Sequence, residues 1–151
     1  MPSPNIIWVT LESIRYDHTS LSGYNRETTP TLSRLASRTP SSSFSTCISP
    51  GIWTLPSTAS ILTGTYPSYH GIGGVRDKLS TELTTVPELL SECGYETAIC
   101  MQNTIIGNSG NLDRAFDRSS KVGKSELIAE RRIGIILKYL RNYRKHTTGY
   151  T

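Results

Sequence analysis

Thr54 is the residue of this sequence best placed to act as a nucleophile. It lies in the run Trp53-Thr54-Leu55-Pro56-Ser57-Thr58. Pro56 suits the first turn of a helix, because it lacks an N–H that would have no partner there. The residues from Ser57 to Leu62 then predict a short helix that Gly64 closes. A hydroxyl at the start of this helix would lie beside backbone N–H groups and a positive dipole end, which favour sulfate or phosphate.

Thr54 also has a purely structural interpretation. Threonine is a good N-cap residue, because its hydroxyl accepts a hydrogen bond from an N–H group at the helix start. The motif alone does not choose between these two roles, since short motifs often match by chance.

Glu12 is the first candidate metal ligand. It follows the nearly continuous apolar run from Asn5 to Leu11, which has the length and the β-branched and aromatic content of a buried parallel strand. Ligands of α/β sheets gather at the carboxyl ends of such strands. A carboxylate at this position is therefore expected in a binding site.

The remaining pattern predicts strands that alternate with helices. Thr85 and Glu88 form a capping-box pattern for a helix that runs to Glu92 and ends at Gly94. The other expected elements are a helix around Thr29 to Ser37 that begins near Pro30, a strand over Ser43 to Ile48 and a buried strand over Tyr95 to Met101. This alternation predicts an α/β fold with a parallel sheet.

The carboxyl-terminal segment predicts a basic amphipathic helix. Apolar residues recur with approximate helical spacing from Lys124 to His146, among several arginines and lysines. A solvated basic face around a buried stripe is the ordinary explanation, and binding to a membrane surface is the alternative. We therefore divide the chain into residues 1–120 and a basic helical segment over residues 121–151.

Several segments in order resemble the sulfatase family. The sulfatase signature reads Cys or Ser, any residue, Pro, Ser, Arg, four residues, Thr, Gly. Thr54 to Gly64 resembles this pattern, with Thr54 at its first position and Thr58 in place of the Arg. The chain also resembles the family before and after the signature. Because the matching segments occur in the same order, the similarity is collinear over about residues 4 to 118. The other matching segments are Asn5 to Glu12, Thr28 to Ala36, Thr65 to Gly71 and Thr85 to Ala98.

The resemblance implies a fold, a reaction and a set of site residues. The fold would be part of the sulfatase or alkaline-phosphatase-like parallel sheet flanked by helices, followed by the basic helix. Thr54 would be the catalytic nucleophile, acting on a sulfate or phosphate ester, and Ser57, Thr58 and His70 would bind the substrate. Glu12 and Thr54 would hold a divalent metal, with Ca, Mg or Mn expected before Zn.

The chain departs from the family pattern in two ways that matter chemically. Many sulfatases carry two adjacent Asp residues after the first strand, whereas this chain has Glu12 and Ser13, which favours a single metal. The first signature position of a sulfatase is oxidised to formylglycine, and Thr54 is not a substrate for that chemistry. Threonine does occur there in relatives that transfer phosphoglycerol or hydrolyse phosphonates, so a phosphoglycerol- or phosphoethanolamine-type transferase is the alternative.

Length predicts that the chain is an amino-terminal portion of the family domain. It has 151 residues, and a complete sulfatase-like domain usually has several hundred, with further metal ligands in its second half. Self-association or a missing carboxyl-terminal half would then complete the site. The competing non-enzyme hypothesis is a catalytically silent fragment.

Composition narrows the partners and the location. The formal charge is +4, and no recognisable nucleic-acid module surrounds the basic residues, so no nucleic-acid partner is expected. No stretch approaches the roughly twenty apolar residues of a membrane span. No signal-peptide pattern precedes the first strand, so we expect a cytoplasmic location. The three cysteines are irregularly spaced, which argues against disulfides or zinc and predicts buried thiols.

Two histidines lie near candidate site residues. His70 follows the signature, and it is expected either to contact the substrate anion or to cap and pack a loop. His18 is expected to line the site after the first strand, where Arg15 is expected to pair with Asp17.

Overall fold

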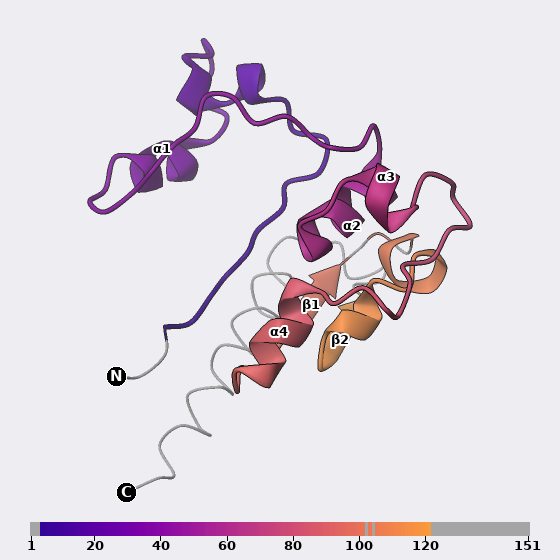
Figure 1. The fold of residues 1–151 in the computed structure, drawn as a ribbon. Coiled ribbons are helices and arrows are strands. Elements are labelled where there is room, and N and C mark those ends of the chain that lie inside the picture. Colours follow the sequence, from indigo (N-terminus) through magenta and orange to yellow (C-terminus); the bar gives the residue numbers. More distant parts are fainter. Residues whose placement is uncertain (1–3, 102, 104, 122–151) are drawn as a thin grey trace, which may run out of the picture. The chain divides into compact units, whose positions relative to one another are not determined.

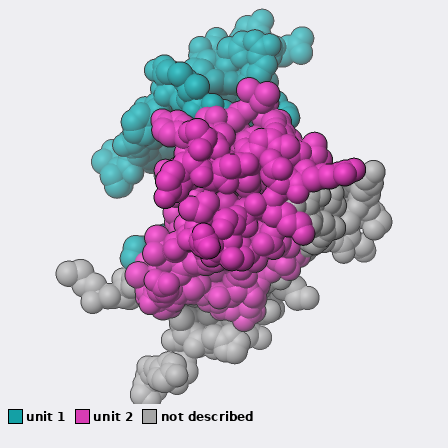
Figure 2. Space-filling view, turned by 45° about the vertical axis from the view of Figure 1, so that its right-hand side comes forward, with its two compact units in different colours: residues 1–49 teal, residues 50–151 magenta. Residues whose placement is uncertain are grey.

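The computed structural model describes residues 4–101, 103 and 105–121. The chain divides into two compact units, a first unit of residues 1–49 and a second unit of residues 50–151 (Figure 2). Helices and a small parallel sheet make the fold broadly α/β, as predicted (Figure 1). The predicted boundary between residues 120 and 121 stays a prediction, and the predicted helix from Lys124 to His146 lies outside the described residues.

Local hydrogen bonds, rather than an apolar core, hold the first unit together. Thr19 is the one buried residue among residues 4–49. The Ser20 N–H donates to Thr29 Oγ1 (3.0 Å), and the Thr29 N–H donates to Ser20 Oγ (2.9 Å). This reciprocal pair ties a short 3-10 helix to the start of α1. The helices are the 3-10 helices η1 (Tyr16–His18) and η2 (Ser20–Ser22) and the α-helix α1 (Pro30–Ala36).

The two strands predicted in the first unit are wrong. Residues 5–11 and 43–48 are assigned to neither helix nor strand, and all of them are exposed. Trp8 and Val9 are each 71% exposed, although the sequence pattern predicts burial. Apolar and β-branched residues favour a strand only where a neighbouring strand and a covering layer receive them, and the first unit contains no strand among its described residues. The predicted helix near Pro30 is confirmed as α1.

The second unit contains the rest of the described helices and both strands. Gly64 takes a left-handed φ of 68° and ends α2, as predicted. The elements in chain order are α2 (Thr54–Thr63), α3 (Pro67–His70), α4 (Val86–Glu92), β1 (Ala98–Met101), the π-helix η3 (Ile105–Ser109), the 3-10 helix η4 (Asp113–Ala115) and β2 (Arg118–Lys121).

A small apolar core in the second unit forms around α2. Leu55 and Ala59 are one turn apart on this helix, and both are fully buried. Ile72, Leu79 and Leu112 complete the buried cluster. Gly110 fits closely against this core, because a Cβ at Gly110 would overlap Leu55 Cδ1. The core therefore fixes the first turn of α2 through Leu55.

Among the described residues of the second unit, the sheet has two parallel strands. Residues Ala98 to Met101 of β1 pair in register with Arg118 to Lys121 of β2. The parallel direction is as predicted, but β1 begins three residues later than the predicted strand. Of the four β1 residues only Met101 is buried, so the expectation of a buried strand here is wrong. Layers on both faces are what bury a parallel strand, and the exposure of Ala98 and Cys100 shows that the described residues do not cover β1 fully.

Two sets of polar contacts, both involving Glu88, fix α4 and the segments bonded to it. The capping box of α4 is confirmed, since the Thr85 N–H donates to Glu88 Oε2 (2.8 Å) and the Glu88 N–H donates to Thr85 Oγ1 (3.4 Å). Arg114 of η4 forms an ion pair with Glu88 (2.6 Å) and also donates to the Ser80 and Leu83 carbonyls. These contacts join α4 to residues more than twenty positions away.

Two further sequence predictions concern cysteines and membranes. Cys47, Cys93 and Cys100 are exposed free thiols, so the prediction of buried thiols is wrong. The first lies outside any element, and the other two lie at the end of α4 and on the little-covered β1. Among the described helices, none has the length and apolar content needed to span a membrane.

Candidate functional site

Thr54 is the first residue of α2 and not its N-cap. The N-cap is Trp53, whose backbone is extended (φ −154°, ψ 176°), so the N-cap interpretation of Thr54 is wrong. The helix begins three residues before the predicted start at Ser57, and Pro56 lies within its first turn, where its missing N–H costs no helical bond. The candidate nucleophile therefore lies at the positive end of a ten-residue helix.

The hydroxyl groups of Thr54, Ser57 and Thr58 share one face of α2. Residues three and four positions apart are neighbours on a helix surface, which places these three together. All three are partly exposed, whereas Leu55 and Ala59 on the neighbouring face are fully buried. Burial of the apolar face thus turns the hydroxyl face away from the core. The roles of Thr54 as nucleophile and of Ser57 and Thr58 in substrate binding stay predictions.

Gly51 is a residue of the site region that sequence reasoning missed. Its carbonyl accepts a hydrogen bond from Ser57 Oγ (2.9 Å), and the Ser57 N–H closes the first turn on the Trp53 carbonyl (3.3 Å). A Cβ at Gly51 would lie 2.9 Å from both the nitrogen and Oγ of Ser57. Only glycine allows this approach. The segment before α2 is therefore held against the helix on the hydroxyl face, beside Thr54.

His70 lies against α2 and is nearly inaccessible to solvent. It is the last residue of α3, and its side chain is buried. The Ile72 N–H donates to Nδ1 (3.1 Å), and Nε2 lies 3.0 Å from Ser60 Oγ on α2. Burial lowers the pKa of His70, although hydrogen bonds to the backbone oppose the effect. Both ring nitrogens thus have partners within the chain, and substrate binding by His70 stays a prediction.

Glu12 lies in the first unit, next to an open hollow of about 440 Å³. Glu12 itself is exposed, and Ser13 after it takes a left-handed φ of 61°. The hollow is lined by Ser13, Ile14, Arg15, His18, Thr28 and Thr29. Its walls combine two basic groups with three hydroxyl groups, which suits a small polar or anionic ligand. His18 lines this hollow, but the strand expected before it is absent, and its place in a catalytic site stays a prediction.

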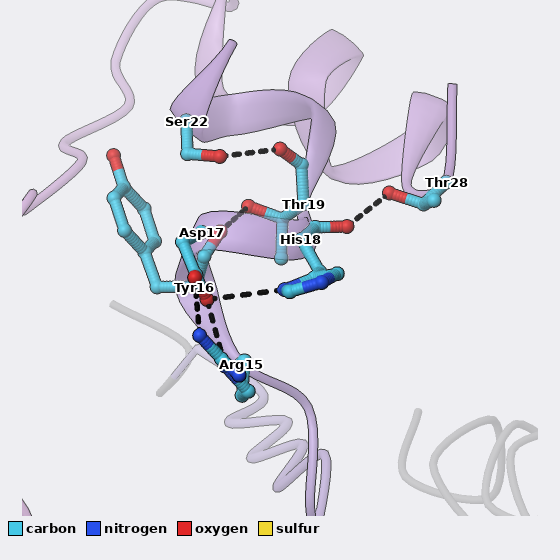
Figure 3. A network of polar contacts seen from close by, with 7 residues as sticks. All are labelled: Arg15, Tyr16, Asp17, His18, Thr19, Ser22 and Thr28. Carbon is cyan, nitrogen blue, oxygen red and sulfur yellow. Dashed lines mark hydrogen bonds and ion pairs between the residues drawn. The ribbon is translucent and has the colours of Figure 1, made fainter. Parts of the chain in front are cut away.

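Asp17 holds the two basic side chains of this hollow (Figure 3). Arg15 donates to Asp17 Oδ1 from Nε (3.0 Å) and to Oδ2 from Nη2 (2.6 Å), so the predicted pair is confirmed. Nδ1 of His18 lies 3.2 Å from Oδ1 of the same carboxylate. The hydrogen bonds from Arg15, and then from His18, hold the pKa of the Asp17 carboxyl below its usual range. All three side chains are well exposed, so the pairs contribute orientation more than stability.

A divalent metal needs more oxygen ligands than Glu12 and Thr54 supply. Ca binds six to eight oxygen atoms, and Mg prefers an octahedron. Among residues 4–101, 103 and 105–121, no three His, Cys, Asp or Glu side chains are grouped so that they could hold a metal ion. The described residues therefore do not fit a complete metal site. We assign no catalytic step to a metal for this reason.

A hydroxyl group at a helix start is an arrangement that suits hydrolases of anionic esters. The sulfatase family model matches residues 4–127, which covers Glu12, the hydroxyl face of α2 and His70. The chain therefore belongs to the sulfatase family, a family of hydrolases. No curated protein and no solved structure matches the chain.

Proposed function

We propose that this chain hydrolyses a sulfate or phosphate ester with Thr54 as its nucleophile. The observation that carries the proposal is the placement of Thr54, which is the first residue of α2 and lies on the hydroxyl face with Ser57 and Thr58. Membership of the sulfatase family supports the reaction class. The N–H groups at a helix start favour the negative oxygens of such a substrate and of its transition state.

The proposed reaction proceeds through a covalent ester of Thr54. Its Oγ loses a proton to a base and forms a bond to sulfur or phosphorus, while the bond from that atom to the ester oxygen breaks. The leaving alcohol takes up a proton. Water then attacks the sulfur or phosphorus of the Thr54 ester, which releases sulfate or phosphate and restores the hydroxyl. An acceptor alcohol in place of water would make the chain a transferase.

The neighbouring hydroxyl groups have separate proposed roles. Thr58 lies one turn after Thr54 on the same face, so it is proposed to contact the substrate. Ser57 donates its hydroxyl proton to the Gly51 carbonyl, so the proposed contact of Ser57 with the substrate requires a substrate oxygen to replace that carbonyl as the acceptor. Glu12 is proposed as one ligand of a divalent metal, with Ca, Mg or Mn preferred. The remaining ligands would then come from residues beyond the described ones or from a second chain.

The test compares Thr54→Ala with Thr54→Ser in the full chain. Hydrolysis of an aryl sulfate and of an aryl phosphodiester is followed with Ca, Mg or Mn added, and with a chelator. Loss of the nucleophile is expected to lower kcat by roughly 10³-fold or more, whereas serine keeps the hydroxyl and part of the rate. Mass spectrometry of the trapped wild-type chain is expected to place the sulfate or phosphate group on Thr54.

Thr63→Ala is the matched control, because Thr63 is on the same helix and bonds to the Ala59 carbonyl instead of facing the helix start. Its kcat is expected to stay within a few-fold of the wild-type value. Turnover by Thr54→Ala at the wild-type rate would refute the nucleophile. If the wild-type chain shows no turnover with any of the metals, the hypothesis of a catalytically silent fragment is supported instead.

A further inference from the structure

His70 forms a two-sided connection between α2 and the segment after α3. Its Nδ1 accepts the Ile72 N–H, so the neutral ring carries its proton on Nε2. That Nε2–H is directed at Ser60 Oγ on α2, 3.0 Å away. His70 and Ser60 are 5% and 6% exposed, so solvent does not compete for either bond. One tautomer of the neutral ring therefore satisfies both partners.

Protonation of this ring would leave two donors facing one another. The imidazolium carries a proton on Nδ1 as well, and that proton would point at the Ile72 N–H, which has nothing to accept. Two backbone carbonyls, those of Pro56 and His70, favour the cation, but burial of the ring outweighs them. Neither α2 nor residues 71–74 contain a titratable side chain, and α3 contributes only Tyr69, which is 71% exposed. The carboxylate bound to this loop, Asp77, accepts the Gly73 and Gly74 N–H groups. An uncompensated charge at a buried site is costly.

We propose that neutral His70 is an acid-sensitive clamp that positions α2, the helix that begins with Thr54, against α3 and the following loop. Acid opens the clamp by protonating the ring, which breaks the bond from Ile72 and loosens the packing of α3 on α2. His70 is then a positioning residue for the hydroxyl face. This effect on catalysis rests on the proposed function, but the clamp itself is a property of the folded chain without substrate.

The first test reads the ring directly by NMR of its nitrogen atoms in the full chain without substrate. We expect the Nε2–H tautomer, and we expect His70 to stay neutral as the pH falls below about 6.5, the ordinary value for histidine. The signals that vanish in His70→Asn identify the ring. An Nδ1–H tautomer, or ordinary titration near pH 6.5 with the α2 and α3 amide signals unchanged, would overturn the clamp.

The second test follows the ratio of unfolded to folded chain against pH. Burial lowers the folded-state pKa of His70, so its contribution is complete above the unfolded-state value and is lost as the pH falls through the folded one. Between these two pKa values the unfolded chain binds one more proton than the folded chain. The ratio of unfolded to folded chain therefore rises by up to about tenfold for each pH unit by which the pH falls. His70→Asn and His70→Gln do not titrate, so this part of the slope is expected to disappear.

Two further variants, compared with the two at position 70, separate the clamp from general destabilisation. Asparagine at position 70 can still accept the Ile72 N–H and glutamine can still reach Ser60, so each variant keeps one side of the clamp. Ser60→Ala removes only the α2 partner and keeps the titrating ring, so its pH slope is expected to remain. His18→Gln is the control at an exposed histidine. A slope in both His70 variants equal to that of the wild type would overturn the proposal and leave the nucleophile untouched.

Discussion

Gly110 is expected to be intolerant of even one added methyl group. A Cβ there would overlap Leu55 Cδ1 and would lie 3.2 Å from the Ile105 carbonyl oxygen. Leu55 is fully buried and cannot move into solvent, and the Gly110 backbone is held by bonds to Ile105 and Leu79. Overpacking of a closed core costs about 1–3 kcal/mol, so Gly110→Ala is expected to lower the free energy of unfolding by that amount.

The complementary change removes the obstructing side chain. Leu55→Ala creates a cavity in the core of the second unit, which costs about 2–5 kcal/mol for a buried leucine. In the double variant the new methyl group of residue 110 occupies part of this cavity. The double variant is therefore expected to be more stable than the sum of the two single changes predicts, by about 0.5–3 kcal/mol.

Urea unfolding of the wild type, the two single variants and the double variant measures this coupling. Gly73→Ala is the matched control, since Gly73 is exposed, has no left-handed φ and has nothing within 4 Å of an added Cβ. Its free energy of unfolding is expected to change by no more than about 0.5 kcal/mol. Strict additivity of Gly110→Ala and Leu55→Ala, or a Gly110→Ala variant as stable as Gly73→Ala, would refute the close contact.

Two further predictions concern polar groups of the second unit. Thr85→Ala removes the capping box of α4 and is expected to lower the free energy of unfolding in urea by about 0.5–2 kcal/mol. The control, Thr81→Ala at an exposed position, is expected to lower it by about 0.5 kcal/mol or less. Equal values for the two variants would contradict the cap. Hydrogen bonds from the Thr97 backbone and side chain lower the pKa of Asp117, so its contribution is complete above the unfolded value of about 3.9 and is lost as the pH falls through the folded value. Asp117→Asn is therefore expected to show a weaker loss of stability between pH 6 and pH 3 than the wild type, and an identical acid dependence in both would contradict this role.

Local signals in the sequence predict the helices of this chain well. The capping box of Thr85 and Glu88 satisfies its donors within four residues, so its geometry does not depend on the rest of the fold. The helix around Pro30 and the glycine that ends α2 are local in the same sense. The start of α2 was predicted too late, because the buried side chain of Leu55 extends the helix toward the core.

Contacts between distant residues were beyond the sequence patterns. The apolar run from Asn5 to Leu11 has the composition of a strand, but a strand exists only where a partner supplies its hydrogen bonds. The approach of Gly51 to Ser57 and of Gly110 to Leu55 depends on tertiary packing that a lone glycine does not reveal. The bonds of His70 also depend on how α3 folds back on α2. The position of Thr54 at the start of a helix was predictable because its motif is continuous, whereas its role as nucleophile stays a prediction.

The environments of the two tryptophans make the fluorescence of the chain a reporter of the second unit. Trp8 belongs to the first unit and is 71% exposed, whereas Trp53 belongs to the second unit and packs, partly buried, against the core cluster around Leu55. Trp8 already emits from a watery environment in the folded chain, so its fluorescence changes little on unfolding. The red shift of the emission spectrum during denaturation consequently reports the unfolding of the second unit. In Trp53→Phe this shift is expected to disappear.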